Sequence, residues 1–236
     1  MAATLGAGTV ASLVHGRSPT TVDEMAQLLH ATLVASGRLT LPTGDAAAAW
    51  VIQNGVMAAD GWASIYPPLH TVLLALGVAG GGAWLVGPIM TGVATGASSW
   101  VIERTAGAAS GRLAGLLLCV SPFWLLVGGT HLSHTTAAAA LALLAACCLA
   151  ARDATTRSRG LLWALGAGGA AGAAICARPW VGLVCGAAIV ASMGPELMRR
   201  DRTRSWLPRL VAVGLGGTPF AVLLFWWNST LFGHPL

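Results

Sequence analysis

The chain has 236 residues, of which 56% are hydrophobic and only 9% charged, where a soluble domain carries roughly 25% charged residues. This composition excludes a soluble globular domain, a disordered chain and a small disulfide-stapled secreted module. The net charge of +5 comes from 13 arginines, since the chain has no lysine. A nucleic-acid-binding protein would carry its basic residues on one face of a water-exposed fold, so the sequence predicts an integral membrane protein instead.

Residues 1–15 form the first apolar stretch. They lack the basic start of a signal peptide and are too short to cross a hydrocarbon layer of about 30 Å. We expect them to be a truncated first transmembrane helix.

Residues 16–83 hold four of the eight acidic residues and are expected to form an extracytoplasmic loop with short surface helices. A first helix is predicted over Val22–Ser36, with Thr20 or Thr21 as its cap and an acidic first turn that complements the helix dipole. A second, over Pro68–Gly80, is too short to span comfortably and is expected to be interfacial or re-entrant.

Residues 84–227 are expected to form a bundle of six transmembrane helices, because backbone polar groups in lipid must be satisfied within the segment. The predicted segments are 84–102, 113–130, 135–151, 160–177, 180–196 and 208–227. Ten of the 13 arginines fall in three alternate connections. The positive-inside rule places those connections in the cytoplasm, and residues 228–236 at the start of an outer loop. The predicted fold is therefore all-α, a polytopic transmembrane bundle with a long outer first loop.

Small residues spaced four apart predict close helix contacts in lipid. This pattern occurs at Gly92 and Gly96, at Gly168 and Gly172, and at Gly182 and Gly186.

Asp23 and Glu24 are candidate catalytic groups. Adjacent carboxylates at a helix start point in different directions, so one could act as a general base while the other orients a partner. The alternative is simple capping of the helix.

Four further positions could bind a substrate. Tyr66 and His70 flank a Pro-Pro pair that fixes an extended entry into a helix, and the alternative is a structural turn with an interfacial aromatic anchor. His131 and His134 flank an outward gap between two helices; they are candidates for phosphate or hydroxyl contact or for structural capping, and no further ligands suggest zinc.

Arg178 is the one arginine in an outward connection of the predicted bundle. Such a residue favours an anionic partner such as a phosphate, with contact to lipid headgroups as the alternative.

The order of these features resembles the N-terminal membrane half of GT-C-type glycosyltransferases, such as protein O-mannosyltransferases and aminoarabinose transferases. The resemblance covers nearly the whole chain through short motifs. They are the Asp-Glu pair, Ser36-Gly37-Arg38-Leu39 to Pro42, Tyr66-Pro67-Pro68-Leu69-His70, Ser121-Pro122, Leu132-Ser133-His134, Ala177-Arg178-Pro179, and Asn228 with Phe232-Gly233-His234-Pro235-Leu236.

The resemblance implies an inverting glycosyltransferase of the plasma membrane whose catalytic face is extracytoplasmic. Asp23 would be the catalytic carboxylate and Glu24 its supporting partner. The donor would be a lipid-linked sugar phosphate, with Arg178, His70 and Tyr66 covering the phosphate, and the acceptor a glycan, lipid or protein. No nucleic acid and no metal ligand is expected, and a requirement for a divalent cation is left open.

Two other functions remain open from the sequence. A small multi-pass transporter would place polar groups midway through its helices, often within inverted repeats, whereas the acids here fall in loops. The second other function is that of an inactive fragment that serves as a membrane partner.

Overall fold

The computed structural model describes residues 1–42, 54–58, 61–200 and 207–235, with the side chains of all but 57 and 193–200. These residues form a predominantly helical structure, as predicted. Its helices are α1 (Ala2–Leu13), α2 (Val22–Ala35), α3 (Pro68–Ala79), α4 (Val86–Ala106), α5 (Ala108–Val120), α6 (Pro122–Gly128), α7 (His134–Asp153), α8 (Arg157–Ala177), α9 (Pro179–Arg200) and α10 (Leu207–Phe232), with a 3-10 turn at Ala83–Leu85.

A small antiparallel hairpin adds to the predicted all-α class. Strand β1 (Gly55–Ala58) pairs with β2 (Gly61–Ser64), with Gly55 opposite Ser64. Leu41 extends the pairing through two backbone hydrogen bonds of 2.9 Å with Trp62. Four-residue strands rich in glycine and alanine carry too weak a pattern to be predicted from sequence.

Within the part of the chain that the structure describes, four helices are long and apolar enough to cross a membrane: Ala83–Ala106, which joins the 3-10 turn to α4, and α7, α8 and α10. A fifth span exists if α5 and α6 are counted together. The sequence predicted six segments. The segment predicted at 180–196 falls in α9 and runs into residues 193–200, whose side chains lie outside the described set; its described part, Pro179–Ser192, is a shorter apolar helix.

The predicted segment 113–130 is bent rather than straight. Helices α5 and α6 meet at an angle of 64°, at the Ser121-Pro122 step. Pro122 has no N–H to continue the helix, and it drives Ser121 into an extended conformation (φ −68°, ψ 113°). The Ser121 hydroxyl then caps the start of α6 by accepting the Trp124 N–H.

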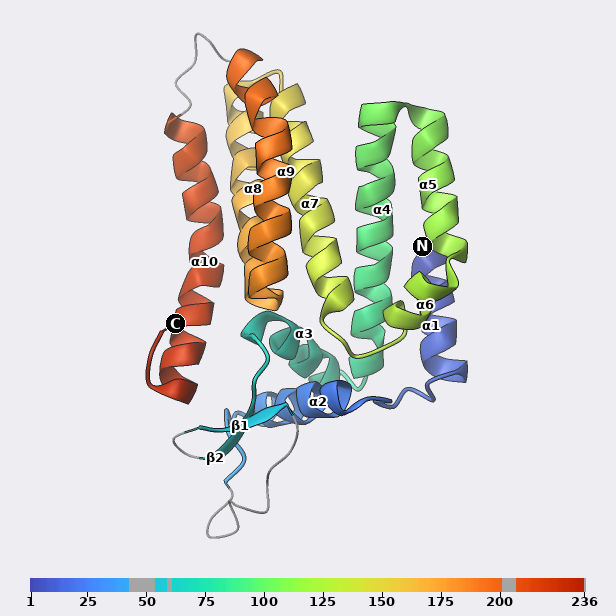
Figure 1. The fold of residues 1–236 in the computed structure, drawn as a ribbon, viewed down its shortest axis with the longest axis vertical. Helices are drawn as coiled ribbons and strands as arrows, with labels where there is room; N and C mark the ends of the chain where they lie inside the picture. Colours follow the sequence, from blue (N-terminus) through green and yellow to red (C-terminus); the bar gives the residue numbers. More distant parts are fainter. Residues whose placement is uncertain (43–53, 59–60, 201–206, 236) are drawn as a thin grey trace.

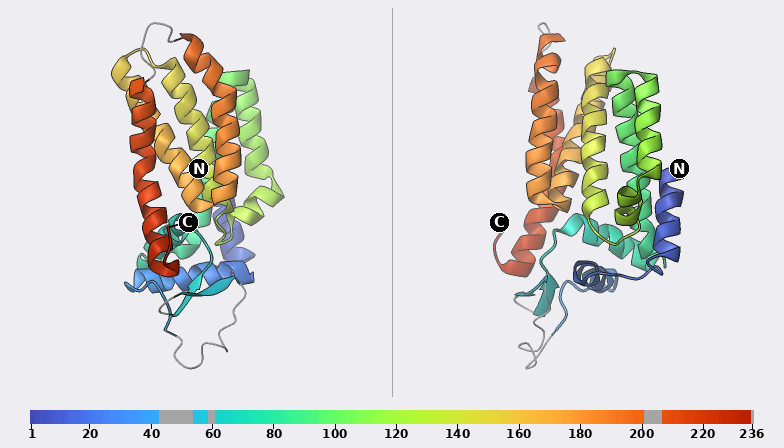
Figure 2. Two further views of the ribbon diagram at one scale, coloured as in Figure 1. Left: turned by 60° about the vertical axis from the view of Figure 1, so that its left-hand side comes forward. Right: turned by 45° about the vertical axis from the view of Figure 1, so that its right-hand side comes forward.

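The long helices lie side by side, and the two ends of this assembly differ (Figure 1). At one end, here called the loop end, α2, α3 and the hairpin lie together, which both views of Figure 2 also show. The opposite end carries the α4–α5 and α7–α8 connections; we call it the arginine end. Arginines near these connections and near the start of α10 are Arg104, Arg112, Arg152, Arg157, Arg159 and Arg209.

Glycines provide the predicted close contacts. A Cβ on Gly168 would overlap the Val213 backbone of α10, and one on Gly172 would press on Phe220. A Cβ on Gly182 would overlap the Ile175 backbone of α8, and one on Gly92 the Thr4 hydroxyl of α1, whereas Gly186 has room and Gly96 has open space. Three of the six predicted positions, Gly168, Gly172 and Gly182, therefore lie where two helix backbones approach.

The C-terminal end of α10 packs against the loop end. Trp227 is 1% exposed and its ring centroid lies 4.9 Å from that of His30 in α2. His30 in turn accepts the Ser64 hydroxyl at Nδ1 (2.7 Å) and donates from Nε2 to the Leu39 carbonyl (2.9 Å). Burial lowers the pKa of His30 to about 4, so this imidazole is neutral and holds α2, the hairpin and α10 together.

Candidate functional site

Four helices begin close to one another at the loop end, and each places one predicted site residue there. Asp23 is the second residue of α2 and Tyr66 precedes the first turn of α3. His134 is the first residue of α7, and Arg178 directly precedes α9. We call these four residues the Asp23 cluster.

Contacts within the cluster centre on the carboxylate. The Tyr66 hydroxyl hydrogen-bonds to Asp23 and lies within electrostatic range of Arg178. His134 interacts electrostatically with both Asp23 and Arg178. The Asn54 amide nitrogen also donates to Asp23, so the carboxylate receives two hydrogen bonds.

The cluster is open to ligands. His134 is exposed, and Asp23, Tyr66 and Arg178 are partly exposed. Among the residues that the structure describes, Arg178 makes no ion pair.

Burial raises the pKa of Tyr66 to about 12, with the charge and the hydrogen bond of Asp23 acting in the same direction and Arg178 and Gln27 opposing them. Tyr66 therefore keeps its proton at neutral pH and acts as a hydrogen-bond donor to the carboxylate.

Glu24 points away from this cluster into the protein. It is fully buried. Oε1 accepts the hydroxyls of Thr20 (2.9 Å) and Thr21 (3.2 Å), and Oε2 accepts the backbone N–H of His131 (2.9 Å). The His131 ring Nδ1 lies 3.4 Å from the same oxygen.

Burial disfavours the charge on Glu24, but hydrogen bonds from the side chain and backbone of His131 and from Thr20 outweigh it and lower the pKa to about 2. Glu24 is therefore an ionised anchor for the loop that precedes α7, because its partners satisfy the buried charge.

His70 continues this arrangement across the interface between α3 and α7. Its Nε2 donates to the His131 carbonyl (2.8 Å), and its Nδ1 accepts the Thr136 hydroxyl (2.8 Å). His70 is 1% exposed, and burial lowers its pKa to about 4. The imidazole is neutral and both nitrogens are used. We call Glu24, His131, His70 and Thr136 the Glu24 network.

All seven predicted site residues thus lie at the loop end, in two adjoining groups. The sequence expectation that Asp23 and Glu24 point in different directions is confirmed. The alternative for this pair was capping of the helix. The side-chain cap of α2 is Thr21, whose hydroxyl accepts the Glu24 N–H (3.3 Å). His70 and His131 are buried (1% and 2% exposed), unlike the exposed His134.

Two residues of the site were missed from the sequence. Gln27 hydrogen-bonds to Tyr66 and could have been found, because it lies four residues after Asp23 on the same face of a helix. Asn54 donates to Asp23 from the hairpin, and its positive φ of 64° suits a turn residue. Nothing in the sequence pairs it with α2.

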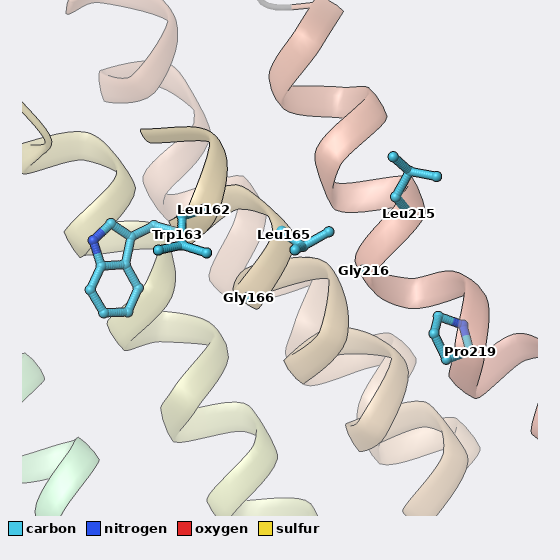
Figure 3. Close-up of a pocket in the computed structure, with 7 residues that line it drawn as sticks. All are labelled: Leu162, Trp163, Leu165, Gly166, Leu215, Gly216 and Pro219. Carbon is cyan, nitrogen blue, oxygen red and sulfur yellow. The ribbon is translucent and has the colours of Figure 1, made fainter. Parts of the chain in front are cut away.

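A separate pocket of about 530 Å³ lies between α8 and α10, as Figure 3 shows. Its walls are apolar and include Leu162, Leu165, Leu215 and Pro219. These side chains carry no titratable group, so the pocket offers no reactive chemistry. Within the described ranges, no group of three or more His, Cys, Asp or Glu side chains is arranged to hold a metal ion.

Comparisons with protein-family models, with curated proteins and with solved structures found no match. A function for this chain therefore has to be inferred from its own residues and their geometry.

Proposed function

We propose that this protein is a membrane glycosyltransferase, which moves a sugar from a polyprenyl-phosphate donor to a hydroxyl of an extracytoplasmic glycan, lipid or protein. One observation supports this most strongly. A partly exposed carboxylate, Asp23, lies beside an arginine without an ion-pair partner among the described residues, Arg178, and an exposed His134. A base next to a cationic site is what transfer from a phosphate ester requires.

In the proposed reaction Asp23 accepts the proton of the acceptor hydroxyl as its oxygen attacks the anomeric carbon. The bond between that carbon and the phosphate oxygen breaks, and the electron pair stays on the phosphate. Attack from the face opposite the leaving group inverts the anomeric configuration. Hydrogen bonds from Tyr66 and Asn54 fix the direction in which Asp23 points.

The leaving phosphate would be stabilised by Arg178 and His134. An arginine offers five N–H donors in a geometry that matches phosphate oxygens. The helix macrodipole adds about half a positive charge at each helix start, and the starts of α2, α3, α7 and α9 are all near this position (Figure 1). The local potential therefore favours an anion.

The Glu24 network would act as a support for this centre. Glu24 fixes the backbone of His131, which lies three residues before His134. His70 then ties the same loop to α3 and α7. The network therefore sets where His134 lies relative to Asp23 without touching the substrate.

The distribution of charge favours an enzyme over a small transporter. In the described parts of the long apolar helices, Glu103, Arg104, Arg152 and Asp153 lie near helix ends at the arginine end. Transporters coordinate their substrates near the bilayer midplane with polar groups of broken helices. Here the titratable groups of the candidate site lie at the loop end.

The direct test replaces Asp23 by asparagine and measures transfer of a labelled sugar from polyprenyl-phosphate donors to water-soluble and lipid acceptors. We expect a loss of transfer of roughly 100- to 10,000-fold, the usual contribution of a general base. Asparagine keeps the size of the side chain and its hydrogen-bond acceptor oxygen, so the protein should still fold.

The matched control is Glu103→Gln, which also neutralises one exposed carboxylate but at the arginine end. It should transfer at the wild-type rate. Equal transfer rates for Asp23→Asn and wild type, at equal protein levels, would show that Asp23 is not the catalytic base.

A further inference from the structure

Gln27 has a buried acceptor atom without a partner in the described structure, directly beside the Asp23 cluster. The residue is 1% exposed, and its Oε1 has no hydrogen-bond partner among the described residues. Leaving such a group unpaired is costly, and native proteins pair the great majority of buried polar atoms. Within the described residues, Gln27 Oε1 is thus an acceptor that could take one more donor.

The position of Gln27 connects it to the candidate chemistry. It lies one helical turn after Asp23 on α2, and residues four apart share one face of a helix. Tyr66 hydrogen-bonds to both side chains. Asp23, Tyr66 and Gln27 thus form a continuous hydrogen-bonded row.

The direction of each bond in this row follows from the groups present. An ionised carboxylate only accepts, so the single Tyr66 proton goes to Asp23. The Tyr66 oxygen must then accept from the Gln27 amide nitrogen, since the hydroxyl has no second proton to donate. The hydrogen bond to Tyr66 thus identifies which end of the Gln27 side-chain amide is the nitrogen. It leaves the Gln27 carbonyl oxygen as the free end of the row.

We propose that Gln27 binds a hydroxyl group of the transferred sugar or of the acceptor, and so selects a polyol ligand at the Asp23 cluster. The amide carbonyl oxygen of Gln27 is a neutral hydrogen-bond acceptor, so an uncharged hydroxyl donor suits it. This inference rests on the proposed function, because it names a ligand contact for the same centre. Gln27 is a specificity-determining residue in this account, and Asp23 remains the base.

The first measurement uses the only tyrosine of the chain as a probe. Tyr66 is the single tyrosine in 236 residues, so protein labelled with ¹³C at the tyrosine ζ carbon gives one NMR resonance. Gln27→Met, which keeps an unbranched side chain of similar length, should shift that resonance. Thr32→Val, on the exposed side of the same helix, should not.

The second measurement adds polyprenyl-phosphate mannose, glucose and aminoarabinose, each with analogues that lack one hydroxyl. In wild type, removal of one particular hydroxyl should weaken binding roughly 10- to 100-fold. Gln27→Met should bind the complete ligand more weakly than wild type by the same factor. Removal of that hydroxyl from the ligand should then cause no further loss of binding to Gln27→Met. Gln27→Glu keeps an acceptor oxygen and loses the amide donor. It should therefore shift the Tyr66 resonance and still bind the complete ligand more tightly than the deoxy analogue.

The possible failures can be told apart. If every deoxy analogue weakens wild type and Gln27→Met equally, or if no donor of the panel shifts Tyr66, the inference is wrong. If Gln27-dependent binding is found while no sugar is transferred, the ligand contact stands and the proposed reaction fails. If transfer occurs and Gln27→Met matches wild type with every donor, the reaction stands and this role of Gln27 does not.

Discussion

Asp23 and Glu24 are adjacent in sequence and yet have opposite surroundings. Asp23 is partly exposed and receives hydrogen bonds from Tyr66 and Asn54, whereas Glu24 is sealed in the protein by threonine hydroxyls and the His131 backbone. Successive residues of a helix point about 100° apart, which separates the two carboxylates. A reactive group and a structural anchor can therefore occupy neighbouring positions.

Buried histidines predict how stability responds to acid. The pKa values of His30 and His70 fall from 6.5 to about 4 in the folded protein, because burial disfavours their charged forms. Between pH 6.5 and 4 the unfolded chain binds protons that the folded chain does not. Stability is therefore fully present above pH 6.5 and falls through this window, by up to about 3 kcal/mol for each histidine.

Thermal unfolding of the detergent-solubilised protein between pH 8 and pH 4 would measure this loss. His70→Gln, which keeps a donor and an acceptor, should be less sensitive to pH than wild type, because one of the two buried histidines with a pKa near 4 is then absent. Glu24 affects the stability of the folded protein at lower pH. Its depressed pKa adds stability above pH 4.5 that is lost as the pH falls toward 2. An identical pH dependence in His70→Gln and wild type would refute the role assigned to burial.

At the scale of elements, α2 supplies the frame of the site. Thr21 caps its start, Glu24 anchors the loop before α7, and Asp23 and the buried Gln27 both interact with Tyr66. Because these residues lie on one helix of 14 residues, their spacing is set by helix geometry rather than by a loop.

The contact between α8 and α10 gives a prediction about packing. A Cβ on Gly168 would overlap the Val213 carbonyl of α10, while a Cβ on Gly214 meets nothing within 4 Å. Gly168→Ala should destabilise the protein by about 1–3 kcal/mol through overpacking. Gly214→Ala should be neutral or stabilise by up to about 1 kcal/mol, because alanine is the better helix former. Equal unfolding midpoints for the two variants would contradict this interface.

Much of this arrangement follows from sequence patterns and part of it does not. Helix α2 ends within one residue of its predicted end. Thr21 caps its start, and Gly37, with a positive φ of 77°, follows its end. The bend between α5 and α6 was not predicted, although Ser121-Pro122 carries the signal for it. The contact of Asn54 with Asp23 joins residues 31 positions apart, and no local pattern encodes such a pairing.

The site residues were predicted individually, but their division into two groups was not. His134 and His131 look equivalent in sequence, since both flank the same gap. In the structure His131 is 2% exposed and bound to Glu24, whereas His134 is exposed. Burial depends on packing between α2, α3 and α7, which a local pattern of one chain does not contain.

The whole molecule is polarised along its long axis. The Asp23 cluster lies at the loop end, and the arginines of the connections lie at the other end (Figure 1). By the positive-inside rule the arginine end would face the cytoplasm and the loop end the outside. Transfer from an outer-leaflet donor requires this orientation.

Single cysteines, introduced into a cysteine-free variant, would test this orientation in intact cells. Met25→Cys and Ile65→Cys lie at exposed positions beside the Asp23 cluster on two different elements, and Thr155→Cys lies in the exposed α7–α8 connection. A membrane-impermeant thiol reagent should label Met25→Cys and Ile65→Cys directly, and Thr155→Cys only after permeabilisation. Labelling of Thr155→Cys from outside, or protection of either of the other two until the cells are opened, would contradict an extracytoplasmic transfer centre.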